Sequence, residues 1–403
     1  MSSSLLLFFL DAVRYDYVNR ETTPFLHELA MTGLSAPMRT ILGFDGIAAT
    51  IATGTYPDTH GIWTQYLRAV NGDAPFRWMR PLASMLDWIE KGIASSMLRK
   101  SLRVSTIAAA MMAGGMKHYP GAHEVPYRLL PSLTYSLKNK IYAPDVFPVP
   151  TVFDILRQNG LRMLAIDHPA LGRDTNVVAR ALKTPKKVDL TYVRLMDLDE
   201  TTHAHGTRSL ERVRATHATD NAVREIVEHY SRMDADPWIM IFADHGMIDV
   251  QNTMDVPALL SKSGFDRKEY SVFLDSTMAR FWGDHGILGR IAEVLQSTCQ
   301  GRILDEDDRR RFRLPGDRYG QLIYLANPGT LIFPSYYATR RPEKATHGYD
   351  PSAPGQDTLF IVRHPDISGR HTERVNLVDI APTILDIFGV KKPDHFEGRS
   401  LVR

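Results

Sequence analysis

Cysteine is almost absent from this chain: Cys299 is the only one among 403 residues. A single thiol excludes an intramolecular disulfide framework and every zinc site built from several cysteines. Any bound metal ion must therefore be held by Asp, Glu and His side chains. The chain has 15 histidines, which makes such a site possible.

Long hydrophobic runs and an excess of one charge are also missing. No segment reaches the roughly 20 consecutive apolar residues that a membrane-spanning helix needs. With 48 Lys and Arg against 46 Asp and Glu, the formal net charge is +2, whereas proteins whose main partner is nucleic acid present clustered basic surface. We therefore expect neither a transmembrane protein nor a nucleic-acid-binding one.

The N-terminus contains one short apolar run, Leu5–Leu10, that could be mistaken for the core of a signal peptide. It has no basic region before it and no cleavage site of small residues after it. We interpret it as a buried strand that ends at Asp11. On this interpretation we expect a cytoplasmic protein.

Short apolar runs alternate with helical patterns along most of the chain. This predicts an α/β fold with a mostly parallel central sheet and helices on both faces. The predicted strands are Leu5–Leu10, Arg162–Ile166, Leu190–Met196, Trp238–Ala243 and Thr358–Val362. The predicted helices are Pro24–Met31, Thr151–Gln158, Leu210–Arg232 and Pro382–Phe388.

Residues 71–143 differ in composition from the rest of the chain. They carry ten Lys and Arg against four Asp and Glu, and they hold six of the 16 methionines. We predict that they form a helical cap, with Leu82–Ala113 helical, inserted into an α/β domain of residues 1–70 and 144–403. The basic side chains of this helical stretch are Lys91, Arg99, Lys100 and Arg103. The segment is either a cap with a solvated basic face or a surface for peripheral contact with an anionic membrane or a long anionic substrate.

Acidic residues and histidines follow three of the predicted strands. They are Asp11, Asp199 with His203, and Asp244 with His245. In parallel sheets, ligands collect outside the carboxyl ends of the strands. A carboxylate at the end of a buried strand is costly unless a partner such as a divalent cation neutralises it. The pattern therefore points to a metal site at this edge of the sheet.

Each of these residues has a simpler interpretation when taken alone. A lone Asp after a strand is commonly a helix cap or a turn residue, and the spacing of Asp199 and His203 occurs often by chance. Asp244-His245-Gly246 is more informative, because the glycine allows close backbone approach beside two adjacent ligands. With His347 the set has six donors, and imidazole plus carboxylate without thiolate suits zinc, manganese or iron. Two such cations can clamp the attacking and leaving oxygens of a displacement at phosphorus.

The order and local sequence of these residues resemble the alkaline phosphatase superfamily, specifically its nucleotide pyrophosphatase/phosphodiesterase-like branch. The matching segments are Asp11–Tyr17, Thr23–Leu26, Thr53–Ile62, Asp199–Gly206, Ala243–Met247, His347–Asp350, Val378–Leu385 and Gly398–Leu401. The resemblance covers almost the whole chain apart from residues 71–143. It implies an alkaline-phosphatase-like fold and hydrolysis of phosphate esters, above all phosphodiesters. The substrate would be a small molecule or, beneath the basic cap, a lipid-linked one.

Carried over position by position, the resemblance also implies two divalent cations, zinc in the first place and manganese as the alternative. It assigns one cation to Asp199, His203 and His347, and the other to Asp11, Asp244 and His245. Two further histidines are interpreted as supporting or structural residues, namely His205 and His60.

The chain departs from this family at the nucleophile. Family members place Thr or Ser at the start of the helix before the Thr-Gly-x-x-Pro turn, where this chain has Phe44 and Asp45. Asp45 is then a catalytic residue, as site ligand or as a nucleophile that forms an aspartyl-phosphate. Alternatively it is a helix N-cap beside hydroxide held by the metal ions, or it marks a catalytically silent metal-binding homologue. A phosphoryl or phosphoethanolamine-type transferase is a further alternative, since fold does not fix the acceptor.

Overall fold

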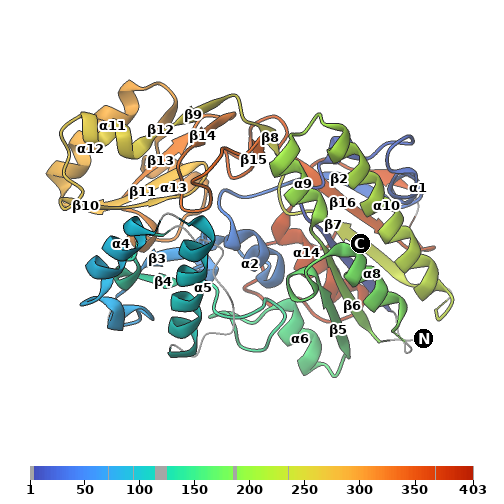
Figure 1. Cartoon of the computed structure of the whole chain (residues 1–403). Helices are drawn as coiled ribbons and strands as arrows, with labels where there is room; N and C mark the ends of the chain where they lie inside the picture. The colour runs from blue at the N-terminus through green and yellow to red at the C-terminus, as the bar shows by residue number, and fades with distance from the viewer. Residues whose placement is uncertain are drawn as a thin grey trace.

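The computed structural model describes residues 4–70, 72–93, 95–113, 125–184, 188–234, 236–367 and 369–402. Its larger lobe is built on an eight-stranded sheet (Figure 1). The strands are β1 (Leu5–Leu10), β2 (Leu34–Arg39), β5 (Met163–Asp167), β6 (Leu190–Leu195), β7 (Trp238–Phe242), β16 (Thr358–Arg363), β17 (Arg370–His371) and β18 (Val375–Asn376). In space they follow the order β17-β2-β16-β7-β1-β6-β5, and β18 pairs with β2.

The centre of this sheet is parallel. β5, β6, β1 and β7 are parallel neighbours, while β16 runs antiparallel to both β7 and β2. The prediction of a mostly parallel sheet is therefore confirmed, and all five predicted strands are present with ends within one residue of those predicted. β2 was not predicted, because Ser35, Pro37 and Arg39 interrupt its apolar pattern.

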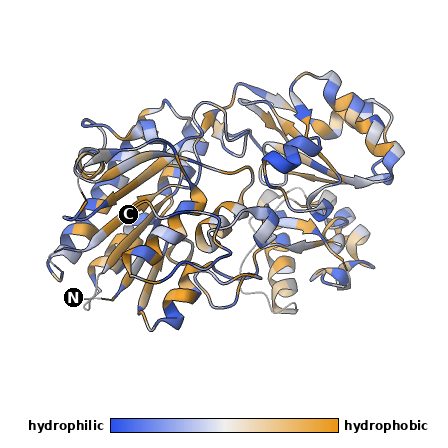
Figure 2. Cartoon of the chain, turned by 180° about the vertical axis from the view of Figure 1, so that it is seen from behind, coloured by the Kyte–Doolittle hydropathy of each residue, from blue (hydrophilic) through white to orange (hydrophobic). Residues whose placement is uncertain are grey.

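Helices cover both faces of the sheet, as predicted. Alternate residues of β1 point to opposite sides, with Leu5, Leu7 and Phe9 in one hydrophobic cluster and Leu6, Phe8 and Leu10 in another. The first cluster includes α2 (Asp45–Thr53), α6 (Val152–Gln158) and α14 (Ile380–Ile387), and the second includes α1 (Pro24–Thr32), α8 (Asp174–Leu182) and α10 (Leu210–Ser231). A strand buried on both faces is apolar throughout, and Figure 2 shows the strands of this sheet as largely hydrophobic.

A second, smaller lobe surrounds a four-stranded antiparallel sheet that the sequence did not predict. Its strands, in spatial order, are β10 (Tyr270–Leu274), β11 (Met278–Gly283), β13 (Leu322–Ala326) and β12 (Gly301–Ile303). The helices of this lobe are α11 (Val256–Lys262), α12 (His285–Ser297) and α13 (Glu306–Arg311). The short strands β9 (Asn252–Met254) and β14 (Thr330–Ile332) pair with each other beside this sheet, and β8 (Ile248–Asp249) and β15 (Ala345–Thr346) pair between this lobe and the larger one (Figure 1).

The insertion packs against this smaller lobe. It contributes β4 (Leu133–Tyr135), which pairs antiparallel with β3 (Tyr66–Arg68) just before the insertion, and the helices α4 (Ala83–Gly92) and α5 (Ser96–Ala113). Its buried apolar residues, from Phe76 to Tyr135, and Tyr66 of β3 share one hydrophobic cluster with residues 254–336. The fully buried Arg280 of β11 adds a polar link, since it pairs with Asp275 and donates a hydrogen bond to the backbone oxygen of Tyr66.

One expectation for the insertion is confirmed and another is wrong. Leu82–Ala113 is largely helical, as predicted, but in two helices, because α4 ends at Gly92 and the following Ile93 has extended backbone angles; glycine is among the poorest helix formers. Arg103 does not lie on a solvated basic face, since it is buried and pairs with Glu90. The side chains of Lys91 and Lys100 lie outside the described residues.

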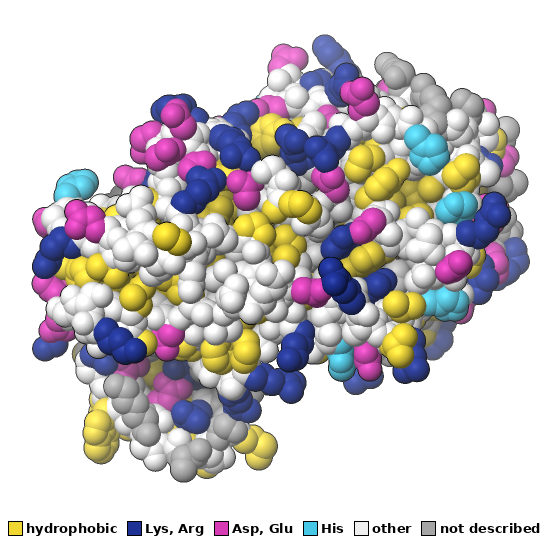
Figure 3. All heavy atoms as spheres, turned by 90° about the horizontal axis from the view of Figure 1, so that it is seen from above, with side chains coloured by type: hydrophobic (Ala, Val, Ile, Leu, Met, Phe, Trp, Pro, Cys, Tyr) yellow, Lys and Arg dark blue, Asp and Glu magenta, His cyan; other side chains and the backbone are white. Residues whose placement is uncertain are grey.

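The surface carries charges of both signs. Figure 3 shows Lys and Arg side chains intermixed with Asp and Glu over the face seen from above, in keeping with the small net charge. Within the described ranges, no helix is both long enough and apolar enough to cross a membrane.

Candidate functional site

The parallel strands end level with one another, and this places the predicted ligands side by side. Leu10 of β1 lies opposite Leu195 of β6, and Phe9 lies opposite Phe242 of β7. The chain then supplies Asp11 after β1 and the pair Asp244 and His245 after β7. Helix α9 (Asp197–His205) begins just after β6 and carries Asp199 and His203, and His347 directly follows β15.

A cavity of about 310 Å³ opens at this edge of the sheet. All seven residues predicted from the sequence line it: Asp11, Asp45, Asp199, His203, Asp244, His245 and His347. Residues separated by more than 300 positions are thus brought to one place. Their individual roles in binding or catalysis stay predictions.

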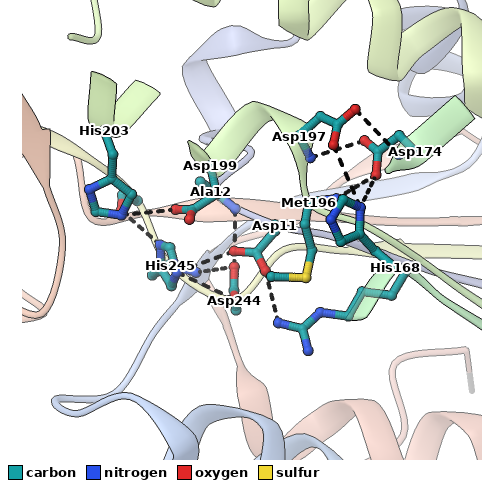
Figure 4. A network of polar contacts seen from close by, with 12 residues as sticks. Asp11, Ala12, His168, Asp174, Met196, Asp197, Asp199, His203, Asp244 and His245 are labelled. Carbon is teal, nitrogen blue, oxygen red and sulfur yellow. Dashed lines mark hydrogen bonds and ion pairs between the residues drawn. The ribbon is translucent and has the colours of Figure 1, made fainter. Parts of the chain in front are cut away.

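Asp11, Asp244 and His245 form the first group of donors. The Nε2 atom of His245 lies 3.3 Å from Asp11 Oδ1 and 3.4 Å from Asp244 Oδ2. Asp244 Oδ1 accepts hydrogen bonds from the backbone N–H groups of Ala12 and His245, which fixes the carboxylate (Figure 4). Gly246 permits this turn, because a Cβ there would overlap the carbonyl oxygen of Gly355.

Asp199, His245 and His347 form a second group that shares His245 with the first. One possible ligand atom from each lies within 4.8 Å of the others. The rings of His245 and His347 are stacked, with centroids 3.5 Å apart and planes 7° from parallel. His203 lies beside this group: its Nε2 is 3.4 Å from Asp199 Oδ1, and its Nδ1 is 2.9 Å from the carbonyl oxygen of Ala345.

The electrostatics of the first group are dominated by burial and by close charges. Although burial opposes ionisation, the hydrogen bond with His245 and the charge of Arg194 hold the pKa of Asp11 below its usual range. Burial and the negative charge of Asp11 raise the pKa of Asp244 to about 7. Although burial opposes protonation, the neighbouring Asp244 and Asp11 raise the pKa of His245 to about 9. These acids therefore require positive charge close by.

His347 of the second group and His203 beside it have pKa values shifted in opposite directions. Burial and the neighbouring His245 and His203 hold the pKa of His347 well below its usual range, so its ring is neutral. Although burial opposes protonation, Asp199 and Glu343 hold the pKa of His203 well above its usual range. A neutral imidazole is the form that coordinates a metal ion.

The residues present fit divalent cations. His347 Nδ1 is a buried atom without a hydrogen-bond partner among the described residues, and so is Asp199 Oδ1 apart from its ion-pair contact with His203. Buried polar atoms are normally paired, so each unpaired atom calls for an explanation. The contact of His203 Nδ1 with the Ala345 carbonyl oxygen fixes the ring and leaves Nε2 for coordination, as is usual for ligand histidines. All of these donors are oxygen or imidazole nitrogen, the set that zinc and manganese accept.

Asp45 lies on the wall of the same cavity, at the start of α2. It is the first residue of the helix, and Phe44 occupies the N-cap without a side-chain hydrogen bond. The interpretation of Asp45 as the N-cap is therefore wrong. Its carboxylate accepts a hydrogen bond of 3.4 Å from Ser136 Oγ. Burial raises its pKa to about 6, against the effect of this hydrogen bond.

Several residues of the cavity wall were missed from the sequence. Arg194 donates to Asp11 Oδ2 at 2.8 Å, and its guanidinium lies over the ring of Phe9. The sequence signal for Arg194 was its charge within the otherwise largely apolar strand β6. Lys140 and Tyr142 both contact Asp167 Oδ2, at 3.2 and 3.1 Å, and all three line the cavity. They lie far from the ligands in sequence, and no motif marks them.

A third group of possible ligands lies next to the cavity but is explained by the packing of the chain. His168, Asp174 and Asp197 come together at the ends of β5 and β6 (Figure 4). Asp174 accepts hydrogen bonds from His168 Nδ1 and from the backbone N–H groups of Met196 and Asp197. These bonds join the two strand ends, and we assign no metal to the group.

The two supporting histidines lie away from the donors. His60 is buried at the end of α3 (Pro57–His60), where Nε2 contacts Thr50 Oγ1 at 3.0 Å and Nδ1 accepts from the backbone N–H of Ile62. Burial lowers its pKa to about 3. His205 is exposed and does not line the cavity. These contacts are in keeping with the structural role predicted for His60, which stays a prediction.

Solved structures of the same fold include ectonucleotide pyrophosphatase/phosphodiesterase 5 from two mammals. The human protein is 15% identical, with a TM-score of 0.71 over 98% of this chain and 97% of that one. The murine protein is 14% identical, with a TM-score of 0.71 over 98% and 97%. An inactive murine variant with one threonine replaced by alanine, in complex with AMP, gives a TM-score of 0.70 over 98% and 96% at 14% identity.

Comparison of the sequence with curated proteins and with protein families gives one match, to a family. No curated protein matches the chain. The family of type I phosphodiesterases and nucleotide pyrophosphatases matches residues 5–350, which include all seven predicted site residues. This chain therefore belongs to the type I phosphodiesterase/nucleotide pyrophosphatase family.

Proposed function

We propose that the chain hydrolyses phosphodiesters with two divalent cations held at the carboxyl edge of its central sheet. Membership of the family gives the reaction class, hydrolysis of a phosphate ester. The observation that carries the proposal is the pair of overlapping donor groups, Asp11–Asp244–His245 and Asp199–His245–His347, in one cavity. The proposed cations are zinc or, as the alternative, manganese.

Asp11, Asp244 and His245 would hold one cation, and Asp199, His203 and His347 the other. Such cations neutralise charge on the phosphoryl oxygens and stabilise the leaving oxygen. Arg194 has a positioning role, because its hydrogen bond to Oδ2 of Asp11 leaves Oδ1 facing His245.

Asp45 is the proposed nucleophile. An oxygen of its carboxylate forms a bond to phosphorus while the bond to the leaving oxygen breaks, and that oxygen departs with both electrons and takes a proton from water. Water then attacks phosphorus, the bond to Asp45 breaks, and the carboxylate is restored. The support for this role is that Asp45 lies on the cavity wall without a helix-capping bond and is, with Phe44, one of the two residues found where family members have the hydroxyl.

The cavity wall opposite the donors suits an anionic or hydrogen-bonding substrate group. Lys140 lies there in an ion pair with Asp167, and Tyr142 and Tyr337 supply aromatic surface, with hydroxyl groups that donate to Asp167 and Gln65. A structural neighbour is described in complex with AMP, so we propose nucleotide esters as the first substrates to test. A lipid-linked substrate and a cytoplasmic location stay predictions.

A catalytically silent, metal-binding homologue is the second proposal. It is favoured by the carboxylate of Asp45 in place of the family's hydroxyl. In the structural neighbour described as inactive, one threonine is replaced by alanine. In this proposal the donors bind cations and the cavity binds a phosphate ester, but no attack on phosphorus follows.

Hydrolysis of chromogenic esters tests the first proposal. Purified protein is incubated with bis-p-nitrophenyl phosphate, p-nitrophenyl esters of nucleoside monophosphates and p-nitrophenyl phosphate, each with Zn²⁺ or Mn²⁺. We expect release of p-nitrophenol from a diester, loss of this activity with EDTA, and recovery when the metal is restored. Protein that carries stoichiometric metal but hydrolyses none of the esters would favour the silent homologue.

A further inference from the structure

Large hydrophobic side chains that face solvent are concentrated on the insertion. Among the described residues, twelve such side chains are exposed, and nine of them lie between residues 78 and 112. These nine are Trp78, Leu82, Met85, Trp88, Ile89, Met97, Leu98, Val104 and Met112. We call them the cap face. Monomeric soluble proteins rarely expose this many apolar side chains together unless a partner covers them.

Helix α4 packs Ala83 and Leu86 against the core but also exposes large apolar side chains and buries acidic ones. Met85, Trp88 and Ile89 are exposed, and Trp88 retains 75% of its accessible surface. The acidic residues Asp87 and Glu90, in contrast, point inward. A surface helix of a globular protein normally buries its apolar stripe and exposes its charges. The arrangement in α4 is typical of a helix that has an apolar environment outside the protein.

The inward acids are neutralised within the insertion. Arg103 of α5 pairs with Glu90 of α4, which also holds the two helices together, and Arg128 pairs with Asp87. The third described acid of the segment, Asp73, pairs with Arg318 of the smaller lobe. No described acidic side chain of the insertion is therefore left without a basic partner.

The basic residues around the cap face remain available. Arg77, Arg80 and Arg99 are exposed, and none of them forms an ion pair with another described residue. The insertion thus exposes apolar side chains together with arginines that are their neighbours in sequence, such as Arg77 beside Trp78 and Arg99 beside Leu98. This combination is the one by which amphipathic helices bind at the surface of membranes that contain anionic lipid.

We propose that the cap face docks on a membrane that contains anionic lipid. Trp88 and the methionines and leucines of α4 and α5 enter the boundary between headgroups and acyl chains, and the arginines contact the lipid phosphates. None of the cap-face residues lines the cavity that holds the donors. The proposal does not depend on hydrolysis or on bound metal.

Co-sedimentation with lipid vesicles tests this surface in the full-length protein. We expect the protein to sediment with phosphatidylcholine vesicles that contain phosphatidylserine, and less with pure phosphatidylcholine. Trp88→Ser with Leu98→Ser should lower the partition coefficient by about tenfold or more. Each of Arg77→Gln and Arg99→Gln should lower it about fivefold on the anionic vesicles alone.

Two exposed residues of the larger lobe serve as matched controls. Leu210→Ser removes an apolar side chain that is 68% exposed, and Arg208→Gln removes a charge from a side chain that is 94% exposed. Neither should change vesicle binding. Equal binding by the cap-face variants and these controls would overturn the proposal, and so would absence of sedimentation with either vesicle. A dimer seen by sedimentation velocity without lipid, and dissolved by Leu98→Ser, would instead identify the face as an interface between two copies.

Discussion

Replacing His245 by alanine is expected to lower phosphodiester hydrolysis by about 10³-fold, the rate equivalent of several kcal/mol of charge stabilisation by the cations. His245 belongs to both donor groups, so its loss weakens both cation positions at once. It also contacts Asp11 and Asp244, which would keep no imidazole beside them. The measurement is kcat/KM on a chromogenic diester at saturating metal.

The matched control is His205→Ala. This histidine is exposed, belongs to α9 and does not line the cavity. Its replacement should leave kcat/KM within about twofold. Thermal unfolding curves of both variants, recorded at the same metal concentration, separate loss of metal binding from loss of the fold. A His245→Ala protein that is folded and nearly as active as the wild type would refute the role of the shared histidine.

Replacing Asp45 gives the second large effect and separates the two functional proposals. If Asp45 is the nucleophile, Asp45→Ala and Asp45→Asn should lower kcat by roughly 10⁴- to 10⁶-fold, the range for loss of a catalytic nucleophile. The asparagine is the sharper of the two, because it keeps the size of the side chain and removes only the charge. Acid quenching of the wild-type reaction, followed by mass spectrometry, should find on Asp45 the phosphoryl group of the substrate with its remaining ester substituent.

Asp45→Ser and Asp45→Thr complete the series. They place a hydroxyl at the start of α2, where family members have one and where the helix N-terminus favours an anionic oxygen. Activity that rises from nothing in these two variants would establish the silent homologue. Activity in the wild type that survives in Asp45→Ala would contradict both proposals for this residue.

The sequence was sufficient for the part of the fold that positions the site. Fully apolar runs such as Leu5–Leu10 are characteristic of strands buried on both faces, and the structure contains this strand with the predicted bounds. Because parallel strands end at the same edge, acids and histidines at their ends could be grouped before any coordinates were known. Asp11, Asp244 and His245 lie together for this reason.

Other features depend on tertiary contacts that no local sequence pattern indicates. Some strands of the smaller sheet, such as β12 with only Gly301–Ile303, are too short to show an alternation of apolar and polar residues. Lys140 and Tyr142 reach the cavity only through the path of the loop before α6. The sequence also could not show which charged side chains of the insertion point inward. Composition shows that Arg103 is basic, whereas its burial against Glu90 follows from tertiary packing.

The count and location of bound cations test the account most directly. Protein loaded with Zn²⁺ or Mn²⁺ and then freed of excess metal is analysed by elemental analysis and by anomalous diffraction from crystals. The account predicts two cations per chain, one beside Asp11 and Asp244 and one beside Asp199 and His347. Protein that retains no stoichiometric metal, or that binds it away from these side chains, would contradict it.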